Sequence, residues 1–113
     1  MKNKIKKLIL DLLEKNDFIN FIDIENELEK NNINYEGNEV IGPKNYGTVH
    51  YWINMSSDFA DSIIDLKNEK IIKFIVCPIS VYFISGKILK FPIVEKKQIY
   101  DKPHWLPITI ELK

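Results

Sequence analysis

Residues 18–28 read FINFIDIENEL, and this stretch decides the fold because it contains a change from extended chain to helix. Asn20 is one of the residue types preferred at helix N-caps. Asp23 stands at the third helical position, where its side chain can return a hydrogen bond to the cap. Ile19 and Ile24 have the spacing of a hydrophobic staple around that cap. We therefore predict a very short strand at the start of this stretch, followed directly by a helix.

Apolar residues at helical spacing predict two further helices, one on each side of the helix that follows Asn20. In all three helices one face is apolar and the other is polar, so we expect the apolar face to be buried. The apolar faces consist of Ile5, Leu8, Ile9, Leu12 and Leu13 in the first helix, Phe21, Ile24 and Leu28 in the second, and Phe59, Ala60, Ile63, Ile64 and Leu66 in the third. Ser56 or Ser57 is expected to cap the third helix. In the second helix Glu25, Glu27 and Glu29 are predicted to face water.

The sequence after the third helix is rich in β-branched and apolar residues, which predict strands. Ser85-Gly86 is predicted to form a tight turn, because glycine reaches the positive φ that such a turn needs. Residues 33–48 show no periodicity and are interrupted by glycines, so we predict a long loop there. The predicted strands are Val49–Ile53, Ile71–Cys77, Val81–Ile84, Lys87–Val94 and Ile108–Leu112, with a turn at Pro78-Ile79-Ser80 and a linker at Glu95–Lys102.

The order helix, short strand, helix, helix and β-hairpin resembles the winged helix-turn-helix family. The segments that carry the resemblance are Ile5–Leu13, Phe18–Leu28, Phe59–Leu66 and the predicted hairpin Ile71–Ile84. The resemblance implies one α+β domain over residues 1–113, with three helices packed on a mostly antiparallel sheet. It also implies that the third helix enters the major groove of DNA while the hairpin turn touches the DNA backbone. The chain departs from the family by a long insertion between helices two and three.

The charges of the chain cancel in total but are unevenly distributed. Sixteen lysines stand against sixteen acidic residues, and there is no arginine. Residues 1–16 carry a net charge of +3 and residues 71–113 of +4, whereas residues 17–39 carry −6. A neutral chain without arginine lacks both the basic field of nucleic-acid coat proteins and the bidentate reader of guanine. The uneven distribution suits docking on a charged protein surface, or self-association through complementary patches.

The predicted third helix weakens the case for DNA binding further. Asp58, Asp61 and Asp65 form one acidic stripe along it, which DNA phosphates would repel. A winged-helix transcriptional regulator is therefore the alternative reading, and it would depend on contacts from lysine to phosphate. The lysines assigned to this alternative are Lys4, Lys7, Lys67, Lys70 and Lys73, together with Lys2 and Lys6.

Catalytic, metal and cofactor chemistry have little support in the sequence. Cys77 is the lone cysteine and stands in an apolar strand, where cysteine is usually a small buried side chain. A nucleophilic pair with His50 or His104 is therefore not expected. The two histidines do not have the spacing of metal ligands. Residues 37–48 contain glycines and a lysine but lack the strand–GxxxxGK[ST]–helix context of a phosphate-binding loop. We predict no enzyme, no catalytic residue, no metal site and no cofactor.

Aromatic residues in and after the long loop are the candidates for partner contacts, because tyrosine and tryptophan are enriched at interface hot spots. Lys44, Tyr46, Tyr51 and Trp52 form this candidate set, with inward packing of the aromatic rings as the alternative. Trp105 lies in a proline-containing tail and either pins that tail to the core or anchors a partner. We predict a small non-enzymatic binding module of bacterial or phage origin. It acts through protein–protein contacts, with a different protein or as a homodimer.

The N-terminus and the cysteine content indicate where such a protein is found. The lysines near the N-terminus precede only a short apolar run, which Asp11 and Glu14 interrupt, so no secretory signal is predicted. No stretch approaches the ~18 consecutive apolar residues of a membrane span. A single cysteine forms no disulfide within the chain. We therefore expect a cytoplasmic protein without membrane contacts.

Overall fold

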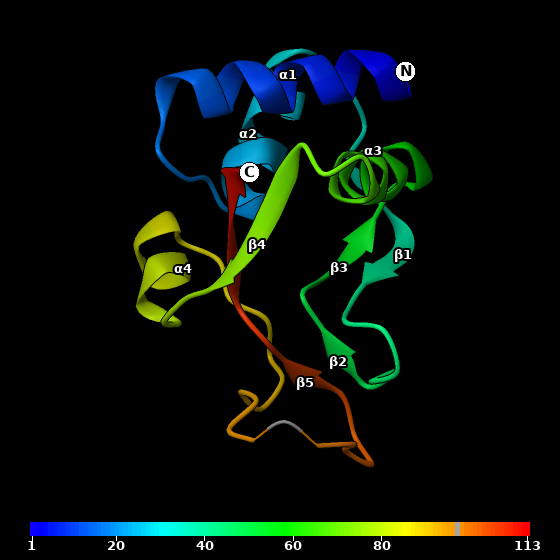
Figure 1. The fold of residues 1–113 in the computed structure, drawn as a ribbon, viewed down its shortest axis with the longest axis vertical. Helices are drawn as coiled ribbons and strands as arrows, with labels where there is room; N and C mark the ends of the chain where they lie inside the picture. The colour runs from blue at the N-terminus through cyan, green and yellow to red at the C-terminus, as the bar shows by residue number, and fades with distance from the viewer. Residues whose placement is uncertain (97) are drawn as a thin grey trace.

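Helices α1, α2 and α3 gather at one end of the molecule, and short strands and a fourth helix form the remainder (Figure 1). The computed structural model describes residues 1–96 and 98–113, so Lys97 of the predicted linker lies outside the described residues. The elements are α1 (Lys2–Lys15), α2 (Phe21–Lys30), β1 (Glu36–Ile41), β2 (Val49–His50), β3 (Trp52–Met55), α3 (Ser57–Asn68), β4 (Ile72–Val76), α4 (Ser80–Ser85), β5 (His104–Trp105) and β6 (Ile108–Leu112). The predicted α+β class is confirmed.

The start of α2 is built as the sequence predicts. The Asn20 side chain accepts a hydrogen bond from the Asp23 N–H at 2.8 Å, and the Asp23 carboxylate accepts one from the Asn20 N–H at 2.9 Å. This reciprocal pair satisfies amide groups that the first turn of a helix leaves without a partner. Just before it, Ile19 exchanges two backbone hydrogen bonds with Ile110, at 2.9 and 2.7 Å. The predicted very short strand is therefore this single bridge.

Strand β6 lies between two partners. On one side it pairs antiparallel with β4, from Ile72 opposite Leu112 to Val76 opposite Ile108. On the other side it meets Ile19, so the spatial order is Ile19, β6, β4. The predicted hairpin of consecutive strands within residues 71–84 is wrong, because the partner of β4 comes from a distant part of the sequence.

Residues 80–85 form helix α4 instead of the predicted turn and strand, so the described residues form four helices where three were expected. Tyr82 is fully buried, and its hydroxyl donates to the Ile108 carbonyl at 2.7 Å. Packing of this one ring explains why a β-prone run becomes helical, since tertiary contacts override local propensity. Gly86 has a φ of 91°, and its N–H donates to the Tyr82 and Phe83 carbonyls at the end of the helix. It is therefore the C-cap of α4 and not part of a hairpin turn.

The insertion between α2 and α3 also contains more strand than predicted. β1 pairs antiparallel with β3, although β1 falls in the predicted long loop. The predicted strand Val49–Ile53 is broken at Tyr51 into β2 and β3, because β2 pairs with β5 and β3 pairs with β1. The predicted strand Lys87–Val94 is irregular apart from a bridge between Ile93 and Trp105.

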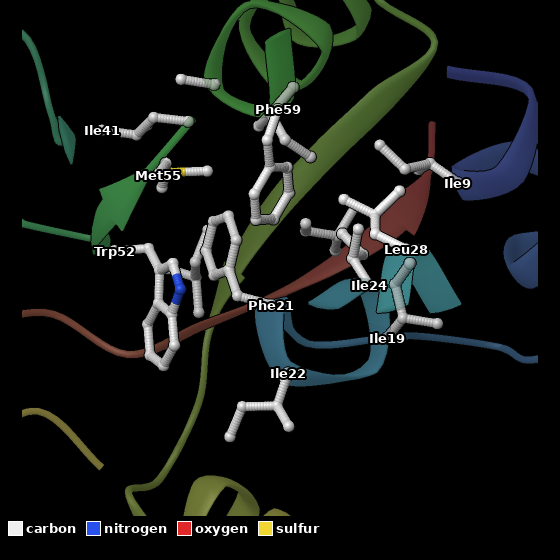
Figure 2. Packing of buried hydrophobic residues seen from close by; sticks show 14 of the residues in the cluster. Ile9, Ile19, Phe21, Ile22, Ile24, Leu28, Ile41, Trp52, Met55 and Phe59 are labelled. Atoms are coloured by element: carbon white, nitrogen blue, oxygen red, sulfur yellow. The ribbon is translucent and has the colours of Figure 1, made fainter. Parts of the chain in front are cut away.

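Five buried aromatic rings, each from a different element, form the centre of the core. Phe21 lies between Trp52 and Phe59 (Figure 2), stacked on the first with ring centroids 5.5 Å apart and edge-on to the second at 6.4 Å. Trp52 also contacts Tyr82 at 5.3 Å and Trp105 at 6.1 Å. This aromatic cluster joins α2, β3, α3, α4 and β5, so burial of its apolar area holds the insertion and the C-terminal segments to the helices.

Glu25 is buried inside this core, and the prediction that it faces water is wrong. Its carboxylate accepts a hydrogen bond from the Trp52 indole N–H at 2.8 Å and an ion pair from Lys87 at 3.0 Å. A buried indole N–H needs an acceptor, and a buried carboxylate needs a donor. The glutamate is therefore the acceptor for the indole, and Lys87 balances its charge from the partly exposed side.

Replacement of Gly42 by alanine should destabilise the fold by about 1–3 kcal/mol, as overpacking does. A Cβ at this position would overlap the Val49 carbonyl oxygen, so β1 and the start of β2 would have to move apart. The measurement is urea-induced unfolding followed by tryptophan fluorescence. Gly47→Ala is the matched control, because no atom lies within 4 Å of the Cβ added there. Equal midpoints for the two variants would contradict the close approach.

Candidate functional site

Two adjoining hollows on the surface lie between β4 and the segment that joins β1 to β2. Their volumes are about 540 and 550 Å³, and both are lined by Pro43, Lys44 and Tyr51, so they form one continuous surface. Strand β4 contributes Phe74 to the first hollow and Val76 to the second. We name this surface the β4-edge groove; it consists of residues 40–44, Tyr46, Val49, Tyr51, Ile64, Lys67, Asn68, Phe74, Val76, residues 94–96, Gln98 and Leu106.

The groove exposes an unusual amount of apolar side chain. Val40, Ile64 and Val76 are 49%, 40% and 64% exposed, although valine and isoleucine are among the residues most often buried. A single exposed valine means little, but these three come from β1, α3 and β4 and line one surface. A contiguous apolar patch with polar residues around it is typical of an interaction site.

Tyr51 lines both hollows and is held firmly by backbone hydrogen bonds. Its N–H donates to the Ile41 carbonyl at 2.7 Å, and its own carbonyl accepts the Trp105 indole N–H at 3.1 Å. Its ring meets the Phe74 ring edge-on, with centroids 5.2 Å apart. Partial burial of the ring raises the pKa of the Tyr51 hydroxyl. The residue that breaks the predicted strand therefore presents a fixed aromatic surface to the groove.

Lysines surround the apolar lining. Lys44, Lys67 and Lys96 line the groove, and none of them forms an ion pair with another described residue. The Lys67 ammonium lies 5.4 Å from the centroid of the Phe74 ring, within the range of a cation–π interaction. Glu95 is the acidic residue of the lining. The groove thus carries positive charge at its rim, although the whole chain is neutral.

The structure brings together three of the five residues predicted as partner contacts. Lys44, Tyr46 and Tyr51 all line the β4-edge groove. Trp52 and Trp105 are 1% and 0% exposed, so their assignment as surface anchors is wrong. Both indoles belong to the aromatic cluster, because burial of their large apolar area stabilises the fold.

Sequence reasoning missed the contribution of β4 and α3 to this groove. Phe74, Val76 and Ile64 line it, and Lys67 was assigned only to DNA contacts. The run Ile71–Cys77 is apolar at almost every position, so the sequence gives no sign of which residues face outward. An apolar run that is partly exposed can be recognised only after the strand partner is known.

The lysines assigned to DNA contacts do not share one surface. Lys2 and Lys6 are bound to α3, with Lys2–Asp65 at 2.8 Å and Lys6–Asp65 and Lys6–Glu69 both at 3.2 Å. These ion pairs neutralise part of the acidic stripe on α3. The remaining assigned lysines are Lys4 and Lys7, exposed on α1; Lys67, in the groove; Lys70, exposed after α3; and Lys73, whose side chain emerges on the face of β4 opposite to Phe74.

The insertion packs against the residues just before the first turn of α3, the turn that would read DNA bases in a helix-turn-helix protein. The Ser56 N–H donates to the Tyr35 carbonyl at 2.8 Å. A Cβ at Gly37 would lie 2.6 Å from the Met55 carbonyl oxygen, so β1 passes in close contact with the residues before the helix. Ser56 itself caps the helix by accepting from the Phe59 N–H at 3.2 Å.

Cys77, His50 and His104 each have surroundings of their own, and no hydrogen bond between described residues joins the thiol to either imidazole. Burial raises the pKa of the Cys77 thiol to about 11 and lowers the pKa of His50. His50 packs against Phe91, with ring centroids 6.0 Å apart, while His104 stacks on Tyr100 at 3.7 Å. In residues 1–96 and 98–113 no group of three or more histidine, cysteine, aspartate or glutamate side chains could hold a metal ion.

Comparisons with protein-family models, with curated proteins and with solved structures found no match to this chain. The winged-helix resemblance therefore stays a prediction from the order of elements. None of the helices that the structure describes has the length and apolar character needed to cross a membrane. The functional conclusion accordingly depends on the geometry of the β4-edge groove.

Asp65→Asn should remove a stabilising interaction that depends on pH. Hydrogen bonds from Lys2 and Lys6 hold the pKa of Asp65 below its usual value of 3.8. A carboxylate with a lowered pKa in the folded state stabilises above its unfolded pKa, and this contribution is lost as the pH falls through the folded value. We expect a small loss of unfolding free energy at pH 7 that vanishes as the pH falls below the lowered pKa of the folded state. Denaturant titrations at pH values from 7 downward measure this loss, with Asp61→Asn as the control. An equal loss in both variants would contradict the ion pairs of Asp65 with Lys2 and Lys6.

Cys77 should react slowly in the folded protein. A thiol pKa of about 11 instead of 9.0 leaves roughly 100-fold less thiolate at neutral pH, and the thiolate is the reactive form. The rate of iodoacetamide alkylation at pH 7.5, followed by mass spectrometry, should be lower by about that factor than the rate in urea. Equal rates in the folded and unfolded chain would show an accessible, activated thiol and reopen the question of a cysteine nucleophile.

Proposed function

We propose that this chain is a small non-enzymatic protein-binding module that holds a segment of a partner protein in the β4-edge groove. One observation carries the proposal: Lys44, Tyr46 and Tyr51 of the insertion line the same groove as Phe74 and Val76 of β4. The two groups of residues are far apart in the sequence. Tyr51 and Phe74 also pack against the buried core, whereas Val76 is 64% exposed. Apolar surface that is left open and surrounded by lysines is suited to recognition of another chain.

The groove is suited to binding because its central residue is already ordered. The backbone of Tyr51 is fixed by hydrogen bonds to Ile41 and Trp105, and its ring rests on Phe74. A partner would therefore not have to meet the entropic cost of immobilising this side chain, which is about 0.5–1.5 kcal/mol for a flexible one. Tyrosine is also among the residues that contribute most to binding energy at interfaces. The buried tryptophans support the site indirectly by positioning this tyrosine.

DNA binding is the weaker alternative for this surface. The lysines assigned to phosphate contacts are divided between α1, the groove and the opposite face of β4. Asp58 and Asp61 are exposed on α3. The Ser56 N–H, just before that helix, donates to the Tyr35 carbonyl of the insertion, so the insertion lies beside the start of the helix. The winged-helix resemblance has lost its predicted hairpin, because β4 pairs with β6 and residues 80–85 are helical, so only the order of the first three helices still carries it.

Random peptides displayed on phage and selected on the immobilised chain test this proposal. We expect selected peptides to bind the wild-type chain and to bind Lys44→Glu about fivefold more weakly, because a rim charge is reversed. Tyr46→Ala should weaken binding by a similar factor through lost apolar contact. Fluorescence anisotropy measures each affinity.

Lys7→Glu is the matched control, since it makes the same charge change at an exposed position outside the groove. Peptide binding that Lys7→Glu leaves unchanged and Lys44→Glu weakens supports the groove. The proposal is overturned if the selected peptides are insensitive to Lys44→Glu. It is also overturned if duplex DNA binds at low micromolar concentration with a steep salt dependence and Lys7→Glu removes that binding.

A further inference from the structure

The two edges of β4 differ in their hydrogen bonding. In an antiparallel pair, alternate residues point their backbone N–H and C=O toward the partner strand, and the residues between them point away. The Lys113 N–H donates to the Ile71 carbonyl, and the Cys77 N–H donates to the Pro107 carbonyl, both at 3.0 Å. Together with the register of the pair, these bonds show that the odd-numbered residues of β4 point their backbone N–H and C=O groups toward β6. The backbone groups of Phe74 and Val76 therefore point to the other edge.

That other edge is open. No backbone hydrogen bond from another described residue reaches the outward N–H or C=O of Phe74 or Val76. The side chains of the same two residues line the two hollows of the β4-edge groove. An open edge strand is a template for another strand, and proteins that are not meant to pair usually protect such edges with charge, proline or a covering element. Here the outward positions carry a phenylalanine and a valine.

We propose that the partner segment binds as an added β-strand along the open edge of β4, and that it is an extended segment in which apolar and acidic residues alternate. This inference rests on the proposed function and specifies how the groove is used. Backbone hydrogen bonds to Phe74 and Val76 would supply affinity, and the two hollows would supply specificity, as in other cases of strand addition.

The spacing of Phe74 and Val76, one in each hollow, supports an extended occupant. Phe74 and Val76 are two positions apart on one strand, which is roughly 6.6 Å along it. Residues i and i+2 of an added strand have the same spacing and the same face. Two apolar side chains of the partner would therefore enter the first hollow, at Phe74, and the second, at Val76.

The charge of the rim selects acidic residues in the partner. Lys44, Lys67 and Lys96 line the groove and form no ion pair with another described residue, whereas Glu95 is the acid that lines it. An acidic segment gains from all three lysines, while a basic one would be repelled. A nucleic acid would satisfy the charge but not the outward backbone groups of β4 or the apolar lining.

A fluorescein-labelled eight-residue peptide of alternating valine and glutamate is the probe, and a valine–lysine peptide of the same length is its control. We expect the acidic peptide to bind in fluorescence anisotropy and the basic one to bind at least about tenfold more weakly. N-methylation of either all valine amides or all glutamate amides then tests the strand geometry. One of the two sets should weaken binding at least about tenfold while the other leaves it unchanged, because only alternate amides face β4.

Variants of β4 test the same point from the protein side. Val76→Pro removes an outward N–H without removing a bond to β6, and proline is tolerated at such edge positions. It should abolish peptide binding, whereas Val76→Ala, which keeps the N–H and loses only apolar lining of the second hollow, should weaken binding about fivefold. Circular dichroism and urea midpoints establish that both variants are folded; if Val76→Pro is not, the N-methylated peptides decide alone.

The outcomes separate the inference from the proposed function. Phage-selected peptides that depend on Lys44 but show no alternation on N-methylation would overturn strand addition and leave the groove as a binding site. Loss of the Lys44 dependence would overturn both. A concentration-dependent dimer in sedimentation that Val76→Pro dissolves would assign the open edge to a second copy of this chain and overturn the partner segment. Tighter binding of duplex DNA than of the acidic peptide at the same site would overturn the charge argument.

Discussion

The hydrogen bond between the Trp52 indole and the Glu25 carboxylate is the contact on which the arrangement of the rest depends. It joins the insertion to α2 at the centre of the aromatic cluster. The 3.0 Å ion pair between Lys87 and Glu25 attaches the irregular segment after α4 to the same point. A buried polar pair of this kind is satisfied in only one geometry, whereas apolar packing alone tolerates several. The pair therefore fixes the position at which the insertion leaves the helices. The wall of the β4-edge groove follows directly from that position, because Tyr51 precedes Trp52 in the chain.

Local signals in the sequence predict the helical part well and the β part poorly. The cap formed by Asn20 and Asp23 and the apolar faces of the first three helices depend on neighbours within a few residues, so the sequence contains them in readable form. Strand β1 has five exposed residues out of six, one of them a glycine, and therefore shows no alternation. Helix α4 consists of residues that usually favour strands, and the burial of Tyr82 decides its conformation. These features depend on contacts between distant parts of the chain, which a single sequence does not display.

The residues of the candidate site also differ in whether the sequence predicts them. Lys44, Tyr46 and Tyr51 were predictable because a loop rich in aromatic residues is a common place for contacts. Phe74 and Val76 were not, because the outward face of an apolar strand is determined by its pairing with β6. The two tryptophans were predicted as surface contacts and are buried, since a residue type that is frequent at interfaces also packs well in cores. Residue type alone therefore identifies candidates, and burial decides between them.

The bridge between Ile19 and Ile110 has a consequence for how the molecule is made. The strand in the middle of the sheet comes from the end of the described chain, while its neighbour Ile19 comes from near the beginning. During synthesis the helices emerge long before the strand that ties them to β4, and contacts between such distant residues form slowly. Until then β4 has two open edges instead of one. The nascent chain thus passes through a stage in which a chaperone or a neighbouring chain can compete with β6 for the same strand.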